Sequence, residues 1–254
     1  MTFGFGLIAA DTTRSRIYLN ALDEAKIKPS WVLLLSKREA NLAEHMLGNI
    51  SKCDRIIDDK MSDEDWPELK YDIMEDISDI LERTNVNYSY ANTTDINSQE
   101  CSDFLESKEE TLVVYSGYGG VIVTQRILEQ GKEFLHVHGG LLPKYKGSTA
   151  CYYELINSGK ISATAIYLSE NIDDGEIIYS NSYKLESNRV RVDHHIDSIA
   201  RSRVLIKSLT IALRNNGSNK LEKKQLQHED GETYYVIHPL LKHIAILAKS
   251  SLEN

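Results

Sequence analysis

The first 35 residues most strongly restrict the fold, because two apolar segments flank a helix-forming one. Phe3–Ala10 is an apolar run of strand length, and Trp31–Leu35 is a second. Between them, the polar turn Asp11–Arg16 offers Asp, Thr and Ser side chains that can cap a helix, which we expect over residues 14–25. A strand, a helix and a strand in this order predict a parallel sheet with right-handed crossovers.

The rest of the chain continues this alternation. Further strands are expected at Val86–Tyr90, Thr111–Ser116, Phe134–His138, Ala163–Leu168 and Ile177–Tyr183. Helices are expected at Glu39–Leu47, Glu68–Arg83, Asn97–Ser107, Thr149–Ser158 and Val192–Arg214. The fold class is therefore α/β, with a mostly parallel sheet flanked by helices.

A composition shift at Asn215–Lys224 marks a second region. We expect a main domain over residues 1–214 and a short C-terminal α+β extension over residues 215–254 that packs on it. The extension begins its structured part with a strand at Tyr234 and continues into a turn and a short apolar helix. The roughly 30 residues after the shift are too few for an independent core.

The overall charge limits the classes of binding partner that this chain can have. A formal net charge of −9 disfavours nucleic acid, whose binding rests on Lys and Arg neutralising phosphates. The three cysteines, Cys53, Cys101 and Cys151, show no metal-site spacing and fit free thiols in a reducing compartment. With no basic leader and no membrane-length apolar run, we expect a cytoplasmic protein with no membrane partner. A homodimer is compatible with the sequence.

Two stretches carry the chemistry. Phe134–Gly147 (FLHVHGGLLPKYKG) places His136 and His138 at alternate positions of a strand, so both side chains leave the same face. Ile172–Ile178 (IDDGEII) supplies two aspartates in a tight turn. A histidine beside a carboxylate can move protons near neutral pH. Residue types alone leave three readings open, which are acyl transfer to an amine, a structural histidine pair and a fragment of a metal site.

A glycine-rich turn follows the strand Thr111–Ser116. Gly117, Gly119 and Gly120 lack a Cβ, so main chain there can approach a flat ligand or adopt positive φ. A tight turn between a strand and a helix explains the same glycines equally well.

The wider pattern resembles a known family. HVHGGLLPKYKG is similar to the signature NxHxSLLPxYRG of the folate-dependent formyltransferases, and IDDGEII resembles their DxGxII turn. SGYGGVIV at Ser116–Val123 stands where the family has its pteridine-binding segment. The register agrees too, since Asp173 follows His138 by 35 residues. The resemblance covers about Thr111–Tyr179 and implies a Rossmann-like catalytic domain.

The resemblance implies roles for individual residues. His138 matches the catalytic histidine and Asp173 the catalytic aspartate of enzymes that move a formyl group from 10-formyltetrahydrofolate to an amine, through a tetrahedral intermediate and without a metal. The pteridine of this co-substrate would lie against main chain of two segments. They comprise Tyr118, Gly119, Gly120, Val121, Ile122 and Val123, together with Ile172 and Asp174.

One position departs from the family pattern. His136 stands where the family has asparagine, which donates a hydrogen bond at any pH, whereas imidazole donates or accepts according to its protonation. If His136 takes the catalytic role of that asparagine, activity gains pH sensitivity. The alternatives are that His136 only packs, or that the site no longer catalyses formyl transfer and the chain only binds folate. A metal-dependent hydrolase using His136, His138 and Asp173 is a further alternative, although no fourth ligand is evident.

The acceptor is expected to be a primary amine, first of all that of a nucleotide-activated amino sugar, because LLPKYKG resembles the form in sugar formyltransferases. A small-molecule amine or hydroxylamine of secondary metabolism is the alternative. Residues that could contact the acceptor are Arg14, Lys144, Ser148, Thr149 and Tyr152. Solvated loops, a helix cap and core packing are the competing explanations for these five.

Overall fold

The computed structural model describes residues 4–36, 56–58, 70–72, 75–185, 192–214 and 231–247. The expected helix at Glu39–Leu47, Cys53 and the composition shift at Asn215–Lys224 lie outside this part. The chain divides into two compact units, residues 1–134 and 135–254. The expected boundary between residues 214 and 215 stays a prediction.

The first unit is built on four parallel strands. They are β1 (Phe5–Ala10), β2 (Trp31–Leu35), β5 (Tyr88–Ala91) and β6 (Leu112–Ser116). Strand β1 pairs with both β2 and β6, and β2 pairs with β5, all in parallel. All side chains of β1, β2 and β6 are buried, which explains why these strands read as continuous apolar runs.

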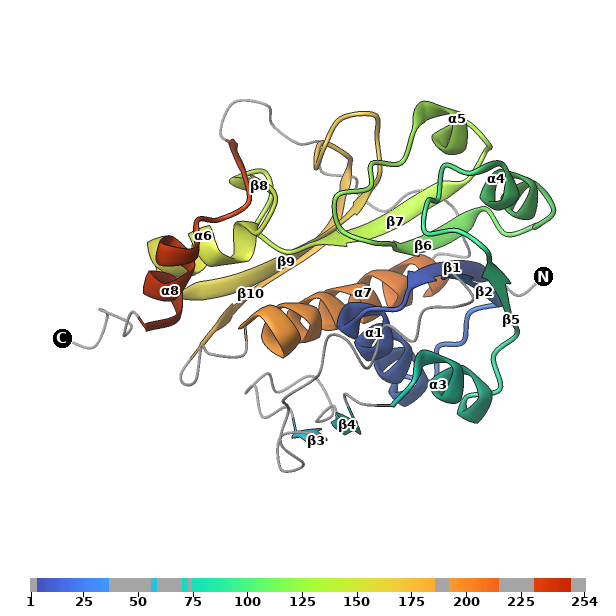
Figure 1. The fold of residues 1–254 in the computed structure, drawn as a ribbon, viewed down its shortest axis with the longest axis horizontal. Helices are drawn as coiled ribbons and strands as arrows, with labels where there is room; N and C mark the ends of the chain where they lie inside the picture. The colour runs from blue at the N-terminus through green and yellow to red at the C-terminus, as the bar shows by residue number, and fades with distance from the viewer. Residues whose placement is uncertain are drawn as a thin grey trace. The chain divides into compact units, whose positions relative to one another are not determined.

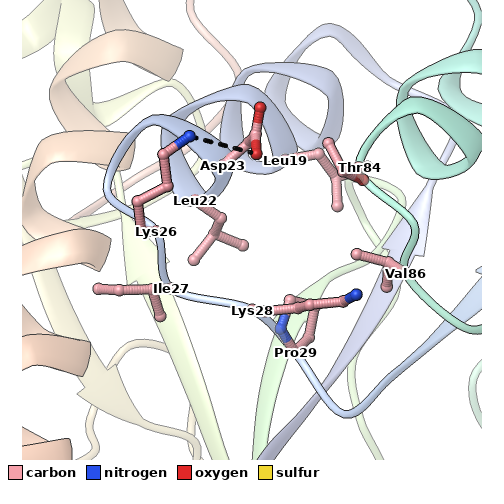
Figure 2. A pocket seen from close by; sticks show the side chains of 9 residues that line it. All are labelled: Leu19, Leu22, Asp23, Lys26, Ile27, Lys28, Pro29, Thr84 and Val86. Atoms are coloured by element: carbon pink, nitrogen blue, oxygen red, sulfur yellow. Dashed lines mark ion pairs between the residues drawn. The ribbon is translucent and has the colours of Figure 1, made fainter.

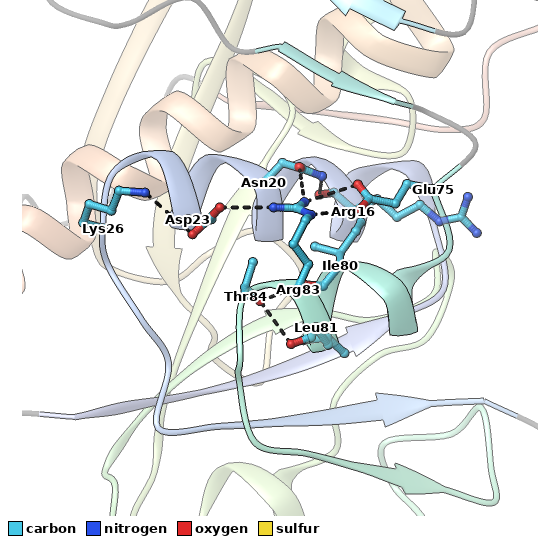
Figure 3. A network of polar contacts seen from close by, with 9 residues as sticks. All are labelled: Arg16, Asn20, Asp23, Lys26, Glu75, Ile80, Leu81, Arg83 and Thr84. Atoms are coloured by element: carbon cyan, nitrogen blue, oxygen red, sulfur yellow. Dashed lines mark hydrogen bonds and ion pairs between the residues drawn. The ribbon is translucent and has the colours of Figure 1, made fainter.

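In the described part of this unit, four helices accompany these strands. They are α1 (Thr13–Glu24), α3 (Ile77–Arg83), α4 (Gln99–Glu106) and α5 (Gln125–Leu128). Thr12 caps α1 by accepting a hydrogen bond from the Ser15 N–H, as the polar turn predicts. Figure 3 shows Arg83 of α3 reaching Asp23 and Asn20 of α1, and also Glu75, so that an exposed polar network ties the two helices together.

The helix expected at Glu68–Arg83 is wrong in its first half. Lys70–Asp72 forms strand β4, which pairs antiparallel with β3 (Ile56–Asp58). The helix begins only after Asp76, whose extended backbone (φ −65°, ψ 145°) marks the N-cap. Pairing with the preceding strand β3 has overridden a helical spacing of apolar residues, which is a weak signal by itself.

The second unit is mainly antiparallel. Strand β9 (Lys160–Tyr167) pairs with β7 (Glu133–His138), which begins in the first unit, and with β10 (Ile177–Lys184). The long helix α7 (Asp197–Arg214) packs on β9 and β10, after a π-helical turn at Val192–Ile196 (Figure 1).

The C-terminal segment joins the signature loop. Strand β11 (Glu232–Tyr234) pairs in parallel with β8 (Tyr145–Gly147). The strand predicted to begin at Tyr234 therefore lies earlier in the chain and ends at that residue. Helices α6 (Ala150–Ser158) and α8 (Pro239–Leu247) lie side by side (Figure 1). The Tyr234 ring stacks on Tyr153 and Tyr145 at centroid distances of 4.4 and 5.7 Å.

The α/β fold class with a mostly parallel sheet is confirmed. Within the described residues, no helix has both the length and the apolar character that crossing a membrane requires.

Candidate active site

Strand β7 delivers the two histidines at its carboxyl end. In the pairing with β9, His136 lies opposite Ile166 and His138 lies opposite Thr164. Alternation along the strand puts both imidazoles on one face. His138 is only 5% exposed, whereas His136 is half-buried. The structure therefore distinguishes a buried histidine from a more accessible one.

Both ring nitrogens of His138 face oxygen atoms. Nδ1 lies 3.3 Å from the Asp173 Oδ1 atom, and Nε2 lies 2.7 Å from the Tyr145 carbonyl oxygen. A carbonyl oxygen can only accept, so Nε2 carries a hydrogen and donates. The second nitrogen can satisfy the carboxylate only if it carries a hydrogen as well. The two contacts thus fix the orientation of the ring between the carboxylate and the carbonyl.

Asp173 is held as an anion. Its Oδ2 atom accepts a hydrogen bond of 2.7 Å from the Gly147 backbone N–H. Burial by itself raises the pKa of Asp173. The hydrogen bond and positive charge of His138, the Gly147 N–H and the charge of His136 outweigh burial and lower that pKa from 3.8 to about 2. The backbone of Asp173 is left-handed (φ 51°), a conformation that Asp and Asn tolerate better than most residues.

The loop that follows His138 is held from β9. The Thr164 hydroxyl donates to the Gly140 carbonyl at 2.7 Å and accepts from the Leu142 N–H at 3.1 Å. The peptide bond between Leu142 and Pro143 is cis. A Cβ at Gly140 would lie 3.0 Å from both the His138 Nε2 atom and the Tyr145 carbonyl oxygen. Glycine there lets the imidazole reach that carbonyl.

A second ion pair reinforces the acidic turn. Lys146 Nζ lies 2.8 Å from Asp174 Oδ1, and both side chains are mostly buried. Gly175 follows directly, and a Cβ there would come within 1.6 Å of the Tyr167 carbonyl oxygen, closer than any atom can approach. Main chain of the turn thus lies against the end of β9. The structure joins the signature loop and the acidic turn through both of their charged pairs.

A buried carboxyl that the motifs did not reveal lies close by. Glu154 on α6 is 2% exposed and accepts a hydrogen bond from the Ser162 hydroxyl. Burial raises the pKa of Glu154, while hydrogen bonds from Ser162 and from the Leu141 backbone and the positive charge of His138 oppose that rise. His138 therefore experiences two carboxyl groups, Asp173 and Glu154.

The glycine turn belongs to the first unit. A Cβ added to Gly119 or Gly120 would have no atom within 4 Å, apart from those of the adjoining residues. Gly120 has positive φ (81°). Ile122 is 56% exposed, whereas Val123 is buried. Arg14 holds the start of the turn, because its guanidinium donates to the Ser116 hydroxyl at 3.1 Å and to the Gly117 carbonyl. The turn therefore presents open main chain beside an exposed apolar side chain.

The other expected acceptor contacts have structural partners. Lys144 is exposed, with Nζ 5.3 Å from the centre of the Tyr145 ring, and Ser148 is exposed. Thr149 is left-handed (φ 53°), and its hydroxyl accepts from the Ile237 N–H at 2.9 Å. Tyr152 is 1% exposed, which favours core packing. Acceptor roles for these residues stay predictions.

A cavity of about 200 Å³ lies elsewhere in the first unit (Figure 2). Its walls include Leu19 and Leu22 of α1, with Pro29 and Val86 from the segments before β2 and β5. It thus opens at the amino ends of the strands, whereas Ser116 and the glycine turn follow a carboxyl end. Ligands in such sheets bind outside the carboxyl ends, so the cavity is separate from the glycine turn.

Metal coordination has no built site in the part of the chain that the structure describes. No group of three or more His, Cys, Asp or Glu side chains there is placed to hold an ion.

Sequence patterns missed the main-chain partners. The Tyr145 carbonyl and the Gly147 N–H leave no signal in residue types. The nearest signal was the glycine content of the loop, since Gly139, Gly140 and Gly147 each permit close approach of other atoms. The pairing of Lys146 with Asp174 was also missed, because the sequence does not show which lysine of the loop turns inward.

Comparison with known proteins gives a consistent set of similarities. The model of a family described as formyl transferase matches residues 61–193, just over half of the chain. A methionyl-tRNA formyltransferase of Finegoldia magna is 33% identical over 102 residues, which cover 39% of this chain and 33% of that protein. The chain spans about a third of the length of the curated relatives it matches.

Two solved structures share the fold. The N-formyltransferase of Helicobacter canadensis, in complex with folinic acid and dTDP-3-aminofucose, has a TM-score of 0.56 at 14% identity, covering 91% of this chain and 70% of its own. The phosphoribosylglycinamide formyltransferase of Anaplasma phagocytophilum has a TM-score of 0.59 at 13% identity, covering 93% and 100%. At these identities the likeness concerns the fold alone.

Proposed function

This chain belongs to the formyl transferase family, and from that premise we propose that it moves a formyl group from 10-formyltetrahydrofolate to a primary amine. The observation that carries the proposal is the contact between His138 and Asp173, at 3.3 Å in a buried setting. The family signature and the acidic turn supply these two residues, and the fold brings them together.

The chain's own groups suit an acyl transfer. The amine nitrogen attacks the formyl carbon, the bond from that carbon to the folate nitrogen breaks, and the proton that the amine loses ends on the folate nitrogen. Asp173, ionised above about pH 2, faces the His138 Nδ1 atom at 3.3 Å and can orient the imidazole. His138 can offer a proton or a hydrogen bond to the carbonyl oxygen once its Nε2–H turns from Tyr145. His136, half-buried on the same face, is the more accessible donor.

The first unit supplies a fitting surface for the donor. A flat pteridine needs main-chain groups that can reach its amide edge and an apolar contact. The open space around Gly119 and Gly120 provides the first, and Ile122, 56% exposed, provides the second. We therefore assign donor binding to Tyr118–Val123 of the first unit; donor contacts of Ile172 and Asp174 stay predictions from the family resemblance.

For the acceptor we propose a nucleotide-activated amino sugar. The Helicobacter canadensis enzyme, which shares the fold over 91% of this chain, was solved with a nucleotide-linked amino sugar. A charge of −9 suits a small acceptor better than a nucleic acid.

A second candidate acceptor is methionyl-tRNA, because curated relatives up to 33% identical are methionyl-tRNA formyltransferases. The match covers only 102 residues, and the acidic charge argues against a tRNA-binding surface.

The test is an acceptor screen with 10-formyltetrahydrofolate. Release of tetrahydrofolate is followed by absorbance, and the formylated product by mass spectrometry, with dTDP-amino sugars and charged initiator tRNA as acceptors. We expect a formyl-sugar product from the wild type and from the control His243→Ala, which changes an exposed histidine of α8. Formate release without a formylated amine, or formylation of tRNA alone, would exclude the amino-sugar proposal.

A further inference from the structure

The glycine turn lacks regular structure but is fixed at both ends. Residues 117–124 form neither helix nor strand. Arg14 holds the first end through the Gly117 carbonyl and the Ser116 hydroxyl. At the far end the partner is Asn97, a residue of the segment between β5 and α4 to which the sequence motifs assign no role. The contacts of Asn97 therefore decide how firmly the far end of the turn is held.

Asn97 uses both ends of its side-chain amide. Nδ2 donates to the Ile122 carbonyl at 2.9 Å. Oδ1 accepts from the Thr124 N–H at 2.8 Å and from the Thr124 hydroxyl at 3.0 Å. An amide is required for this pattern, since it offers a donor and an acceptor side by side. Aspartate would keep the acceptor and lose the donor, and alanine would lose both.

The amide is itself held in place. The Asn97 N–H donates to the Asp95 carboxylate at 2.9 Å, and Arg126 of α5 donates to the Asn97 carbonyl. Side-chain and main-chain contacts of Asn97 thus hold the segment before α4 against the segment before α5. Between the two anchors, Gly119 and Gly120 have open space around them, so packing does little to hold the turn there.

We propose that Asn97 is a positioning residue for folate binding: it fixes Ile122 and the main chain beside it in the arrangement that receives the pteridine. This inference rests on the proposed function, in which Tyr118–Val123 binds the formyl donor. Without Asn97 the turn must be ordered when the donor binds, and the cost appears as weaker binding. The chemistry depends on other residues, so the rate at saturating donor is unaffected.

The experiment measures binding of 5-formyltetrahydrofolate, a stable analogue of the donor, by calorimetry on the full chain. For Asn97→Ala we expect the Kd to rise about tenfold, the equivalent of one or two net hydrogen bonds. Asn97→Asp, which keeps the contact to Thr124, should lie between alanine and wild type. The matched control is Gln99→Ala, two residues along, which contacts Arg126 and Asp103 but not the turn; its Kd should equal that of the wild type.

Two further readouts separate positioning from a general loss of structure. Hydrogen exchange at the Thr124 amide should speed up in Asn97→Ala and stay slow in Gln99→Ala. In turnover assays, KM for the donor should rise while kcat stays within about twofold of wild type. An unchanged Kd in Asn97→Ala, or a fall in kcat with KM unchanged, overturns the inference and leaves the proposed function standing. Failure of the wild type to bind 5-formyltetrahydrofolate overturns the proposed function itself.

Discussion

Replacing Asp173 by asparagine should lower stability in a pH-dependent way. The lowering of the Asp173 pKa from 3.8 to about 2 means that the folded state favours the ionised carboxylate by about 2 kcal/mol. Asparagine keeps the size of the side chain and tolerates the left-handed backbone at this position. The substitution therefore removes the charge and turns one acceptor oxygen into an NH2 donor, so that the contact with either His138 or the Gly147 N–H is lost.

The sign of the pH dependence follows from the direction of the shift. A carboxyl whose pKa is depressed on folding contributes fully above its unfolded pKa, near 4, and loses its contribution as pH falls toward 2. Asp173→Asn should thus be less stable than wild type by about 2 kcal/mol at pH 7, or roughly 4–8 °C in Tm. The difference should shrink between pH 4 and pH 2.

The assay is urea unfolding of wild type and variant at pH 7, 5, 4 and 3, followed by circular dichroism. Asp103→Asn is the control, because Asp103 is exposed on α4 and contacts only Gln99 among the contacts described. Equal stability of Asp173→Asn and wild type at pH 7, or a difference that stays constant down to pH 3, would refute the reasoning about this ion pair.

Three further predictions concern neighbouring positions. His136→Asn restores a donor that does not titrate, so the rate of formyl transfer should vary less between pH 5.5 and 7.5 than in wild type; an unchanged pH profile would show that His136 only packs. Gly175→Ala should fail to yield folded protein in a thermal-shift assay, since its Cβ would lie 1.6 Å from the Tyr167 carbonyl oxygen, while Gly119→Ala, with no atom within 4 Å, should match the wild-type Tm. Lys146→Met leaves the mostly buried Asp174 carboxylate without its 2.8 Å partner and should lower the unfolding free energy by about 1–3 kcal/mol. An unchanged unfolding free energy would contradict this prediction.

Strands were predicted well where burial is complete. The runs at Trp31–Leu35 and Leu112–Ser116 are buried at every position, and no helical spacing competes with them. Strand β8 was not predicted, because Tyr145–Gly147 is too short to show a pattern and its partner, Glu232–Tyr234, lies far along the chain. The helix predicted from Glu68 began too early for another reason, since Lys70–Asp72 pairs with the short strand Ile56–Asp58 that precedes it.

The candidate site was predicted in its side chains but not in its main chain. Resemblance to a family placed His138 and Asp173 in register, and the fold puts them in contact. The Tyr145 carbonyl, which lies 2.7 Å from the His138 Nε2 atom, could not be predicted, because every residue has a carbonyl and only the loop geometry selects one. Glu154 was hidden for another reason, since one glutamate on a helix predicts a solvated face until packing buries it.

The central claim is that His138, held by Asp173, carries formyl transfer. The direct measurement is the rate of tetrahydrofolate release from 10-formyltetrahydrofolate, with the accepted amine, for His138→Ala and wild type. Both proteins are checked for folding by near-UV circular dichroism. We predict that the rate falls by roughly 10²–10⁴-fold in His138→Ala. A variant that is folded and transfers the formyl group at the full wild-type rate would contradict the account.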